Sequence, residues 1–217
     1  MISTSIDLDA EGIHKGYLDV PLSLNNSAWS NQRVPIVSIK SDKSGPTLLL
    51  LGGSHGDEYE GPIVLSNLIH GQLPLEGLHG QLIVMPALNT PAVQQGMRLS
   101  PLDGGNMNRA FPGDPHGTMT ERLAYFVTTQ LIPRSDVVID LHSGGKSLAF
   151  FPCTIVPQQK TEAATARIVA LAGAFNAPMT VILNEPEIAT MIDTQVEAQS
   201  KTMLATELGG GGTVTPE

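Results

Sequence analysis

The chain has 217 residues, of which 41% are hydrophobic, and a formal net charge of -9 at pH 7. This length and apolar content suffice for one large domain with a sizeable core. The negative charge argues against nucleic acid and anionic membranes as partners, because like charges repel. Cys153 is the only cysteine, and no apolar run reaches a transmembrane length. We therefore expect a cytoplasmic protein without disulfides.

The first third of the chain predicts a polar lead-in followed by more regular elements. Residues 1–33 are polar and indicate a loose segment with one strand around Gly16–Leu22. Val34–Lys40 alternates apolar and polar residues, which is typical of an outer strand. Thr47–Leu51 is an apolar run, as in a buried strand. Tyr59–His70 carries its apolar residues on one face, which predicts an amphipathic helix.

The middle third places a long irregular stretch between two buried strands. The strands are expected at Gln81–Pro86 and Asp136–His142. Residues 87–115 are rich in glycine and proline, and so long a stretch inside a compact domain is usually a loop that lines a site. Thr118 and Glu121 have the spacing of a capping box, which predicts that a helix begins there.

The last third alternates short strands with helices. We expect strands at Leu148–Val156, Met179–Leu183 and Thr202–Thr206, and helices at Glu162–Phe175 and near Thr190–Ser200. Strands that alternate with helices predict an α/β fold with a largely parallel sheet.

Four ionisable side chains fall at the C-terminal ends of predicted strands. His55 and Glu58 follow the first buried strand, three residues apart, and His142 and Glu207 stand at the ends of two later strands. Ligands of a mostly parallel sheet bind at these ends, so the four side chains are expected to converge. An imidazole and a carboxylate supply two of the three ligands of a His₂Glu zinc site. A single histidine or glutamate here is more often structural, but four on one edge are harder to explain as packing.

Four segments carry a resemblance to a known family: HGDE (His55–Glu58), NMNRAFPG (Asn106–Gly113), DLHSGG (Asp140–Gly145) and TELGGGG (Thr206–Gly212). They resemble the succinylglutamate desuccinylase/aspartoacylase family, which is related to the zinc carboxypeptidases. Within it they most resemble the branch that deacetylates N-acetyl-2,4-diaminobutyrate in ectoine degradation. The resemblance extends from about Gly45 to the end of the chain. It implies a three-layer α/β fold in which helices flank a mostly parallel mixed sheet.

The resemblance also implies the parts of a zinc-dependent amidohydrolase. It makes His55, Glu58 and His142 the ligands of one Zn²⁺ ion per chain, and Glu207 the catalytic base. Three protein ligands leave a position for water, whose pKa zinc lowers to about 7. A nearby carboxylate can then take the proton as the water attacks an amide, and pass it to the leaving amine.

Three further residues in the irregular stretch receive roles from the same resemblance. Arg98 would face the developing oxyanion, where a fixed cation is more effective than water. Arg109 has the planar fork that suits a substrate carboxylate, and Asn108 would assist it. Asp140 lies two residues before His142 on the same strand face, so a role in orienting that histidine and an ordinary buried hydrogen bond both stay open.

The activity that the resemblance implies is removal of an acyl group, expected to be acetyl, from a small N-acyl amino acid such as N-acetyl-2,4-diaminobutyrate. This substrate carries an ammonium group, for which Asp103, Glu187 and Asp193 are the candidate partners. Two alternatives stay open. A carboxypeptidase-like metallopeptidase would need a cleft for a peptide chain, and a catalytically impaired fragment would only bind metal.

A competing motif overlaps the first loop. Gly52-Gly53-Ser54-His55-Gly56 is also a G-x-S-x-G sequence between a strand and a helix, as in a nucleophile elbow. That fold needs a histidine late in the chain and well separated from its acid. The last histidine here is His142, two residues after Asp140. A serine hydrolase that uses Ser54 is therefore the weaker interpretation.

Members of the family that the chain resembles continue for about another hundred residues past the catalytic glutamate, into a β-rich domain. We therefore expect residues 1–217 to be a zinc-dependent catalytic domain without that C-terminal domain. Apolar surface beside the site should then be exposed, which favours self-association as a homo-oligomer. A wider and wetter site should also give low activity.

Overall fold

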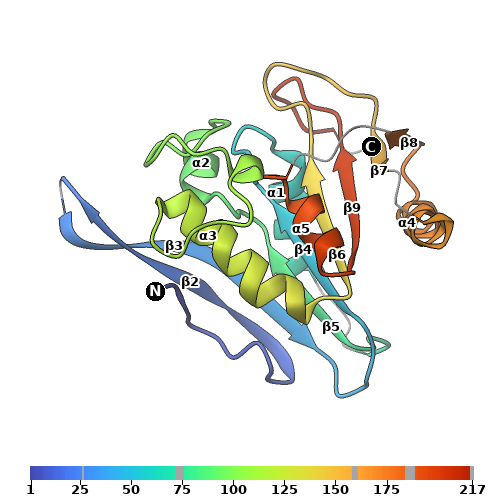
Figure 1. Cartoon of the computed structure of the whole chain (residues 1–217), viewed down its shortest axis with the longest axis horizontal. Helices are drawn as coiled ribbons and strands as arrows, with labels where there is room; N and C mark the ends of the chain where they lie inside the picture. Colours follow the sequence, from blue (N-terminus) through green and yellow to red (C-terminus); the bar gives the residue numbers. More distant parts are fainter. Residues whose placement is uncertain (26, 72–75, 158–160, 184–188, 216–217) are drawn as a thin grey trace.

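The computed structural model describes residues 1–25, 27–71, 76–157, 161–183 and 189–215. Within these ranges a single mixed sheet runs through the molecule in the order β1-β2-β3-β5-β4-β6-β9-β7-β8 (Figure 1). Its strands are β1 (Ser3–Thr4), β2 (Gly12–Leu24), β3 (Ser27–Lys40), β4 (Thr47–Gly52), β5 (Gln81–Met85), β6 (Val137–His142), β7 (Cys153–Pro157), β8 (Met179–Leu183) and β9 (Thr202–Glu207).

Parallel pairing occupies the centre of the sheet. β5, β4, β6 and β9 are parallel neighbours, and β7 pairs in parallel with β8. Antiparallel pairing joins β1, β2, β3 and β5 at one side, and joins β7 to β9 at the other. The mixed sheet with flanking helices confirms the fold class that the sequence predicts.

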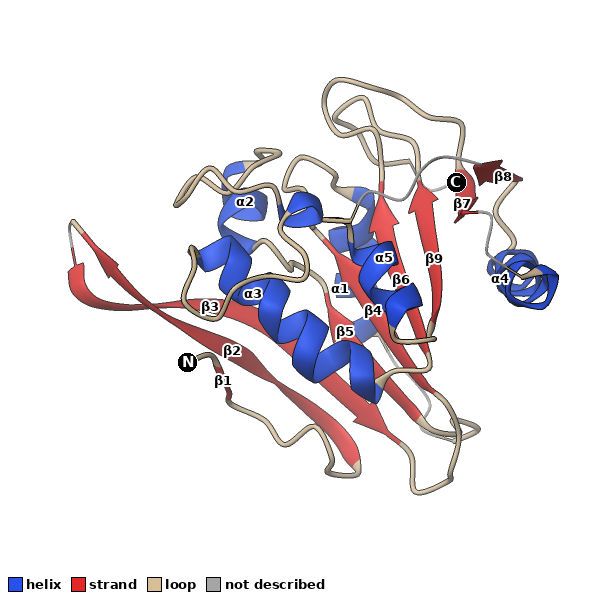
Figure 2. Ribbon diagram, in the orientation of Figure 1, coloured by secondary structure: helices blue, strands red, loops and turns tan. Residues whose placement is uncertain are grey.

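Helices cover both faces of the sheet, which gives three layers (Figure 2). The helices are α1 (Glu60–His70), α2 (Thr90–Gln95), α3 (Met119–Phe126), α4 (Glu162–Phe175) and α5 (Ile192–Ala198). Apolar side chains of α3 and α5 pack on one face, and those of α1 and α4 pack on the other. In β4, Leu49 and Leu51 belong to the first core and Leu50 to the second. A strand covered on both faces needs apolar residues throughout, which explains the run at its centre.

Several predicted elements are confirmed almost residue for residue. The Thr118 side chain accepts the backbone N–H of Glu121, and the Glu121 carboxylate accepts the backbone N–H of Thr118, so the capping box is present. Asn176 ends α4 in the left-handed conformation, with φ 62°. The stretch at residues 87–115 is mostly irregular, apart from α2 and a short 3-10 turn at Met107–Arg109. Every described helix falls short of the length and hydropathy that crossing a membrane requires.

The prediction of a loose lead-in at residues 1–33 is wrong, although the one strand expected there, around Gly16–Leu22, lies within β2. β2 and β3 form a long antiparallel hairpin in register from Gly12 opposite Lys40 to Leu22 opposite Ser30. Along β2, partly or fully exposed residues alternate with more buried ones, with Leu18 and Val20 fully buried. The exposed positions hold a mixture of residues, among them Ile13, Lys15 and Tyr17, so the segment shows neither an apolar run nor a clean alternation of apolar and polar residues.

The predicted strand Leu148–Val156 is wrong in its first half. β7 begins at Cys153, and residues 148–152 form a loop with an isolated bridge between Ala149 and Gly210, both of which lie outside the strands of the sheet. Leu148 and Phe151 are 57% and 64% exposed. Their apolar character therefore does not mark a core strand.

Candidate metal centre and active site

Three neighbouring parallel strands bring the candidate residues to one edge of the sheet. His55 and Glu58 lie in the loop after β4, while His142 and Glu207 are the last residues of β6 and β9. Gly52 pairs with Leu141, and His142 pairs with Glu207, so the three strand ends lie level with one another. This arrangement confirms the convergence that the strand-end positions predict.

Close backbone packing fixes the loop that carries His55 and Glu58. The backbone N–H of Gly56 donates to the carbonyl of Met97 over 2.9 Å. A Cβ atom on Gly56 would lie 1.9 Å from the carbonyl carbon of Ala92, so only glycine fits there. The contact places the segment that carries Arg98 directly against the loop after β4.

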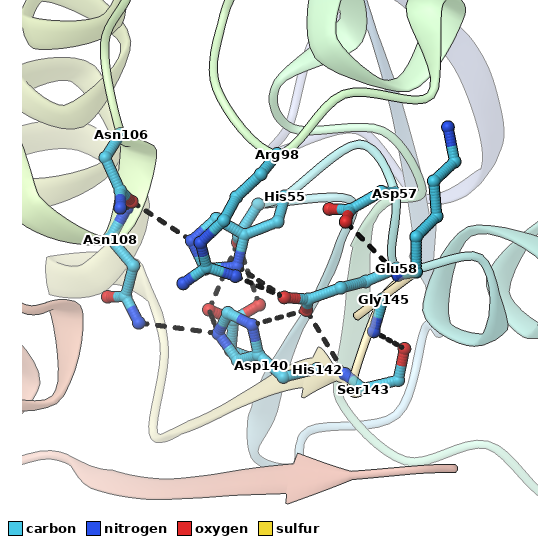
Figure 3. A network of polar contacts seen from close by, with 12 residues as sticks. His55, Asp57, Glu58, Arg98, Asn106, Asn108, Asp140, His142, Ser143 and Gly145 are labelled. Atoms are coloured by element: carbon cyan, nitrogen blue, oxygen red, sulfur yellow. Dashed lines mark hydrogen bonds and ion pairs between the residues drawn. The ribbon is translucent and has the colours of Figure 1, made fainter. Parts of the chain in front are cut away.

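The side chains of His55, Glu58 and His142 meet at a common point (Figure 3). The Glu58 carboxylate lies 2.7 Å from His55 Nδ1 through one oxygen and 2.9 Å from His142 Nδ1 through the other. One ligand atom from each residue lies within 4.8 Å of the others, and all three residues are buried. Two imidazoles and a carboxylate form a donor set that fits a divalent metal such as zinc.

The far side of each imidazole ring faces an oxygen acceptor. His55 Nε2 lies 3.0 Å from Asn106 Oδ1, which also accepts the backbone N–H of Asn108. His142 Nε2 lies 2.9 Å from Asp140 Oδ2. Acceptors at Nε2 hold the proton there and leave the Nδ1 lone pair for a metal, as is common for histidine ligands. Of the two roles left open for Asp140, the structure shows the contact that orients His142.

The Ser54 hydroxyl is committed to the same buried carboxylate. It donates to the two oxygens of Asp140 over 3.0 and 3.2 Å, and Ser54 is only 2% exposed. A nucleophilic serine needs a histidine base at its hydroxyl and access to the substrate. Ser54 supports the orienting carboxylate instead, which argues against the serine-hydrolase interpretation.

The surroundings of Glu58 and His142 move the pKa values of the two side chains in opposite directions. Burial opposes ionisation of Glu58, but hydrogen bonds from His142 and His55 outweigh it and move the pKa of Glu58 well below its usual range. Burial also opposes protonation of His142, but Asp140 and Glu58 outweigh it and raise the pKa of His142 well above its usual value. A metal ion and a proton therefore compete for the imidazole nitrogen.

Glu207 differs from the other carboxylates because it has no strong partner. Burial raises the pKa of Glu207 to about 7; the charges of His142 and Arg98 oppose this rise, and those of Glu58 and Asp140 add to it. Its Oε2 atom is buried and has no hydrogen-bond partner within the described ranges. A carboxylate in this state is suited to accept a proton near neutral pH.

Arg98, Asn108 and Arg109 border the centre in different ways. Arg98 is half-exposed, and its Nη1 donates to Glu58 over 3.1 Å. Asn108 is buried, accepts the backbone N–H of Ile192 over 3.2 Å, and holds its Nδ2 3.5 Å from His142 Nε2. Arg109 is exposed, and its Nη1 donates to the carbonyl of Asn108.

Comparison with known proteins identifies the family of this chain. Residues 44–217 match the model of the succinylglutamate desuccinylase/aspartoacylase catalytic domain. The chain belongs to the succinylglutamate desuccinylase/aspartoacylase family. The N-alpha-acetyl-L-2,4-diaminobutyric acid deacetylase of Halomonas elongata is 45% identical over 216 residues, which cover 100% of this chain and 63% of that protein.

Two solved structures of the family have the same fold. A succinylglutamate desuccinylase from Silicibacter sp. TM1040 superimposes with a TM-score of 0.95 at 43% identity, over 99% of this chain and 65% of that one. The product-bound ectoine utilization protein EutE (DoeB) from Ruegeria pomeroyi gives a TM-score of 0.94 at 45% identity, with the same coverage. The chain thus spans less than two thirds of the length of all three relatives.

A buried hydrogen-bonded pair that the sequence analysis missed supports the metal centre of this family member. The backbone N–H of Ser143 donates to Glu58 over 3.1 Å, and its hydroxyl donates to the carboxylate of Glu60. Glu60 is only 7% exposed. It thereby ties the start of α1 to the residue that follows His142. An acidic residue in the first turn of a helix is common because the helix dipole stabilises it, so Glu60 by itself gives no signal. Only Ser143, which follows His142, could have indicated this role.

We expect Glu60→Gln to weaken zinc binding by about 10-fold or more, because the charge-assisted hydrogen bond that holds Ser143, whose backbone N–H binds Glu58, becomes a neutral one. Zinc affinity is measured by competition with a chromophoric chelator. Glu121→Gln, in the capping box of α3, is the matched control and should lower thermal stability without changing zinc affinity. Equal zinc affinities for Glu60→Gln and the unaltered chain would show that Ser143 needs no anionic partner.

Several apolar side chains of the loop that precedes β7 are exposed. They are Leu148, Phe150 and Phe151. The backbone of this segment binds the loop after Glu207, since Phe150 N–H donates to the Gly209 carbonyl and Gly211 N–H donates to the Leu148 carbonyl. Self-association through this surface stays a prediction.

Proposed function

We propose that residues 1–217 form a zinc-dependent amidohydrolase domain that removes the acetyl group from a small N-acyl amino acid, with N-acetyl-2,4-diaminobutyrate as the preferred substrate. The observation that carries the proposal is the meeting of His55, Glu58 and His142 at one point, next to Glu207 on the adjoining strand, whose buried Oε2 atom has no hydrogen-bond partner among the described residues. The named activity of the Halomonas elongata relative supports the substrate.

His55, Glu58 and His142 would hold the zinc ion through two Nδ1 atoms and a carboxylate oxygen. When bound, zinc supplies a Lewis acid that acidifies water and polarises an amide carbonyl. The protein prepares this site before the metal arrives, because Asp140 and Asn106 already orient the two imidazole rings. Such preorganisation limits the reorganisation needed on binding.

Glu207 is proposed to move the proton. Its Oε2 atom takes a proton from the attacking water and then delivers it to the amine nitrogen as the amide C–N bond breaks. Arg98 is proposed to face the oxygen on which negative charge develops. The Arg98 guanidinium reaches Glu58 from a half-exposed position, so it lies at the mouth of the site rather than beneath it.

Arg109 is proposed to bind the substrate carboxylate, with Asn108 assisting. The Asn108 carbonyl holds Arg109 Nη1 over 2.6 Å, which leaves the other guanidinium nitrogens for a bidentate contact. Asn108 is itself fixed by Ile192 and lies beside His142, so it sets the distance between the carboxylate and the metal centre.

Replacing Arg109 with alanine is expected to raise KM by about 10-fold or more with little change in kcat, because a carboxylate clamp acts in the ground state as well as in the transition state. Arg109→Lys should have a KM between that of the unaltered chain and that of Arg109→Ala, since lysine keeps the charge and loses the planar fork. Steady-state kinetics on N-acetyl-2,4-diaminobutyrate measure the effect. A fall in kcat at unchanged KM would assign Arg109 to the chemical step instead.

The proposal is tested by loading the chain with zinc and assaying N-acetyl-2,4-diaminobutyrate, other N-acetyl amino acids and short peptides. Preferential release of acetate from the acetylated amino acids is expected. Faster cleavage of peptides would favour the metallopeptidase alternative, and zinc binding without any hydrolysis would leave a metal-binding domain. We place the reaction in the cytoplasm, which agrees with the single unpaired cysteine, Cys153.

A further inference from the structure

One charged group of the proposed substrate still lacks a partner. N-acetyl-2,4-diaminobutyrate presents an acetamide, a carboxylate and a side-chain ammonium, and only the first two face residues with proposed roles. The need for a partner of the ammonium group rests on the proposed function. An ammonium group that leaves water for a partly buried site is stabilised best by a carboxylate with an oxygen to spare.

Asp103 has no oxygen to spare. It accepts the backbone N–H of Gly105 over 3.0 Å, and it accepts both the backbone N–H and the hydroxyl of Thr120 over 2.7 and 2.9 Å. Burial acts to raise the pKa of Asp103, but these hydrogen bonds outweigh it and lower the pKa. Asp103 therefore holds the loop onto the start of α3. Glu187, the second candidate from the sequence, lies outside the described residues.

The remaining carboxylates near the centre are also committed or covered. Asp140 and Glu60 bind Ser54 and Ser143. Asp57 has one oxygen without a hydrogen bond among the described residues, but that oxygen is buried. Its carboxylate lies on the Ser143 side of the two histidines, whereas Asn106 and Asn108 lie on the other side (Figure 3).

Asp193 is the remaining candidate, and the fold places it beside the segment that carries Asn108 and Arg109. The N–H of Ile192, its neighbour at the start of α5, donates to Asn108 Oδ1 over 3.2 Å. A second tie joins the same two segments, since the N–H of Phe111 donates to the Thr190 carbonyl over 3.2 Å. Asp193 is half-buried and accepts the N–H of Thr194 at one oxygen. No cation forms an ion pair with it in the part of the chain that the structure describes.

We propose that Asp193 binds the side-chain ammonium of the substrate, so that the site selects N-acyl amino acids whose short side chain ends in a cation. Asp193 and Arg109 then form a pair of opposite charges that matches the ammonium and the carboxylate of one ligand. Burial raises the pKa of Asp193; the hydrogen bond from Thr194 and the charge of Arg109 act against this, and Asp140 adds to it. A bound ammonium favours the ionised carboxylate and offsets the cost of burial.

The test uses two substrates of nearly equal shape on the zinc-loaded chain. N-acetylnorvaline carries a methyl group where N-acetyl-2,4-diaminobutyrate carries the ammonium. We expect Asp193→Asn to lower kcat/KM about 10- to 100-fold for the diaminobutyrate substrate and less than about 2-fold for the norvaline analogue. Glu197→Gln removes a charge from the same helix one turn further on, and should leave both values unchanged.

The outcomes separate this proposal from the proposed function. Equal losses on both substrates, or no loss on either, would overturn the role of Asp193. If the unaltered chain hydrolyses neither substrate, the proposed function fails. Calorimetric binding of free 2,4-diaminobutyrate and norvaline to the zinc-loaded chain then decides the matter. Weaker binding of the diamino acid alone in Asp193→Asn supports the ammonium site, and unchanged affinities overturn it.

Discussion

Replacing Glu207 with glutamine is expected to lower kcat by about 100-fold or more while zinc stays bound. The amide keeps the shape of the side chain but cannot accept a proton. Glu207 belongs to β9 and makes no contact with the three candidate ligands through its Oε2 atom, so the metal centre should survive the substitution. Steady-state kinetics and metal content per chain measure the two effects. Loss of zinc with unchanged turnover per bound ion would make Glu207 a ligand instead of a base.

The pH dependence of the same reaction supplies an independent readout. The base works only when ionised, so kcat/KM should rise with pH through the pKa of Glu207 and level off above it. That pKa is about 7 without metal. A bound dication favours the carboxylate, so the midpoint in the zinc-loaded protein should lie between this value and the ordinary value of 4.5. In Glu207→Gln the acid limb should disappear from the residual activity.

Removing the metal with a chelator is expected to abolish hydrolysis, and adding zinc should restore it, since the metal provides the only strong Lewis acid in the proposed site. Zinc should also raise the melting temperature, because an ion that binds only the folded state stabilises it by about 2.7 kcal/mol at 100 times its Kd. His142→Ala should lose both effects. Activity that persists after metal analysis finds the chain empty would refute zinc dependence.

Acid should weaken zinc binding by this protein more than it weakens zinc binding by a pair of solvent-exposed histidines. Asp140 and Glu58 raise the pKa of His142, so a proton competes with the ion for its imidazole nitrogen more strongly than in an exposed histidine. We expect zinc affinity to increase as pH rises through the pKa of His142. Calorimetry in buffers of different ionisation enthalpy counts the released protons. Zinc binding without proton release would show that His142 is neutral in the free protein.

The convergence of the candidate ligands could be predicted from the sequence because these residues follow apolar strands. An apolar run marks a covered strand, and parallel strands bring their carboxyl ends together, so His55, His142 and Glu207 could be placed without coordinates. Glu60 could not, and Asp193 could only be named as one of three candidates for the substrate ammonium. Each resembles an ordinary acidic residue in the first turn of a helix, and its meaning depends on Ser143 or Asn108, which lie far away in the sequence.

The same limit explains the errors in the fold. The pairing of β2 with β3 depends on cross-strand neighbours, and half of the residues of β2 face outward, so no local pattern reports its length. Residues 148–152 show the opposite error. Their apolar side chains suggested burial. The backbone of this segment is instead hydrogen-bonded to the glycine-rich loop after Glu207, where Gly209 to Gly212 all have positive φ. Local hydrophobicity cannot indicate such an arrangement.

The place of β9 in the sheet has a consequence for the newly made chain. β9 follows β7 and β8 in the sequence, yet it lies between β6 and β7. While the ribosome is still adding residues before 202, β6 presents a bare edge, and β7 and β8 have only each other to pair with. An open edge of a parallel sheet is a template for pairing with other chains. The candidate ligands His55, Glu58 and His142 are all made before residue 202. A nascent chain that binds zinc through them would therefore do so before its proposed base, Glu207, has been added.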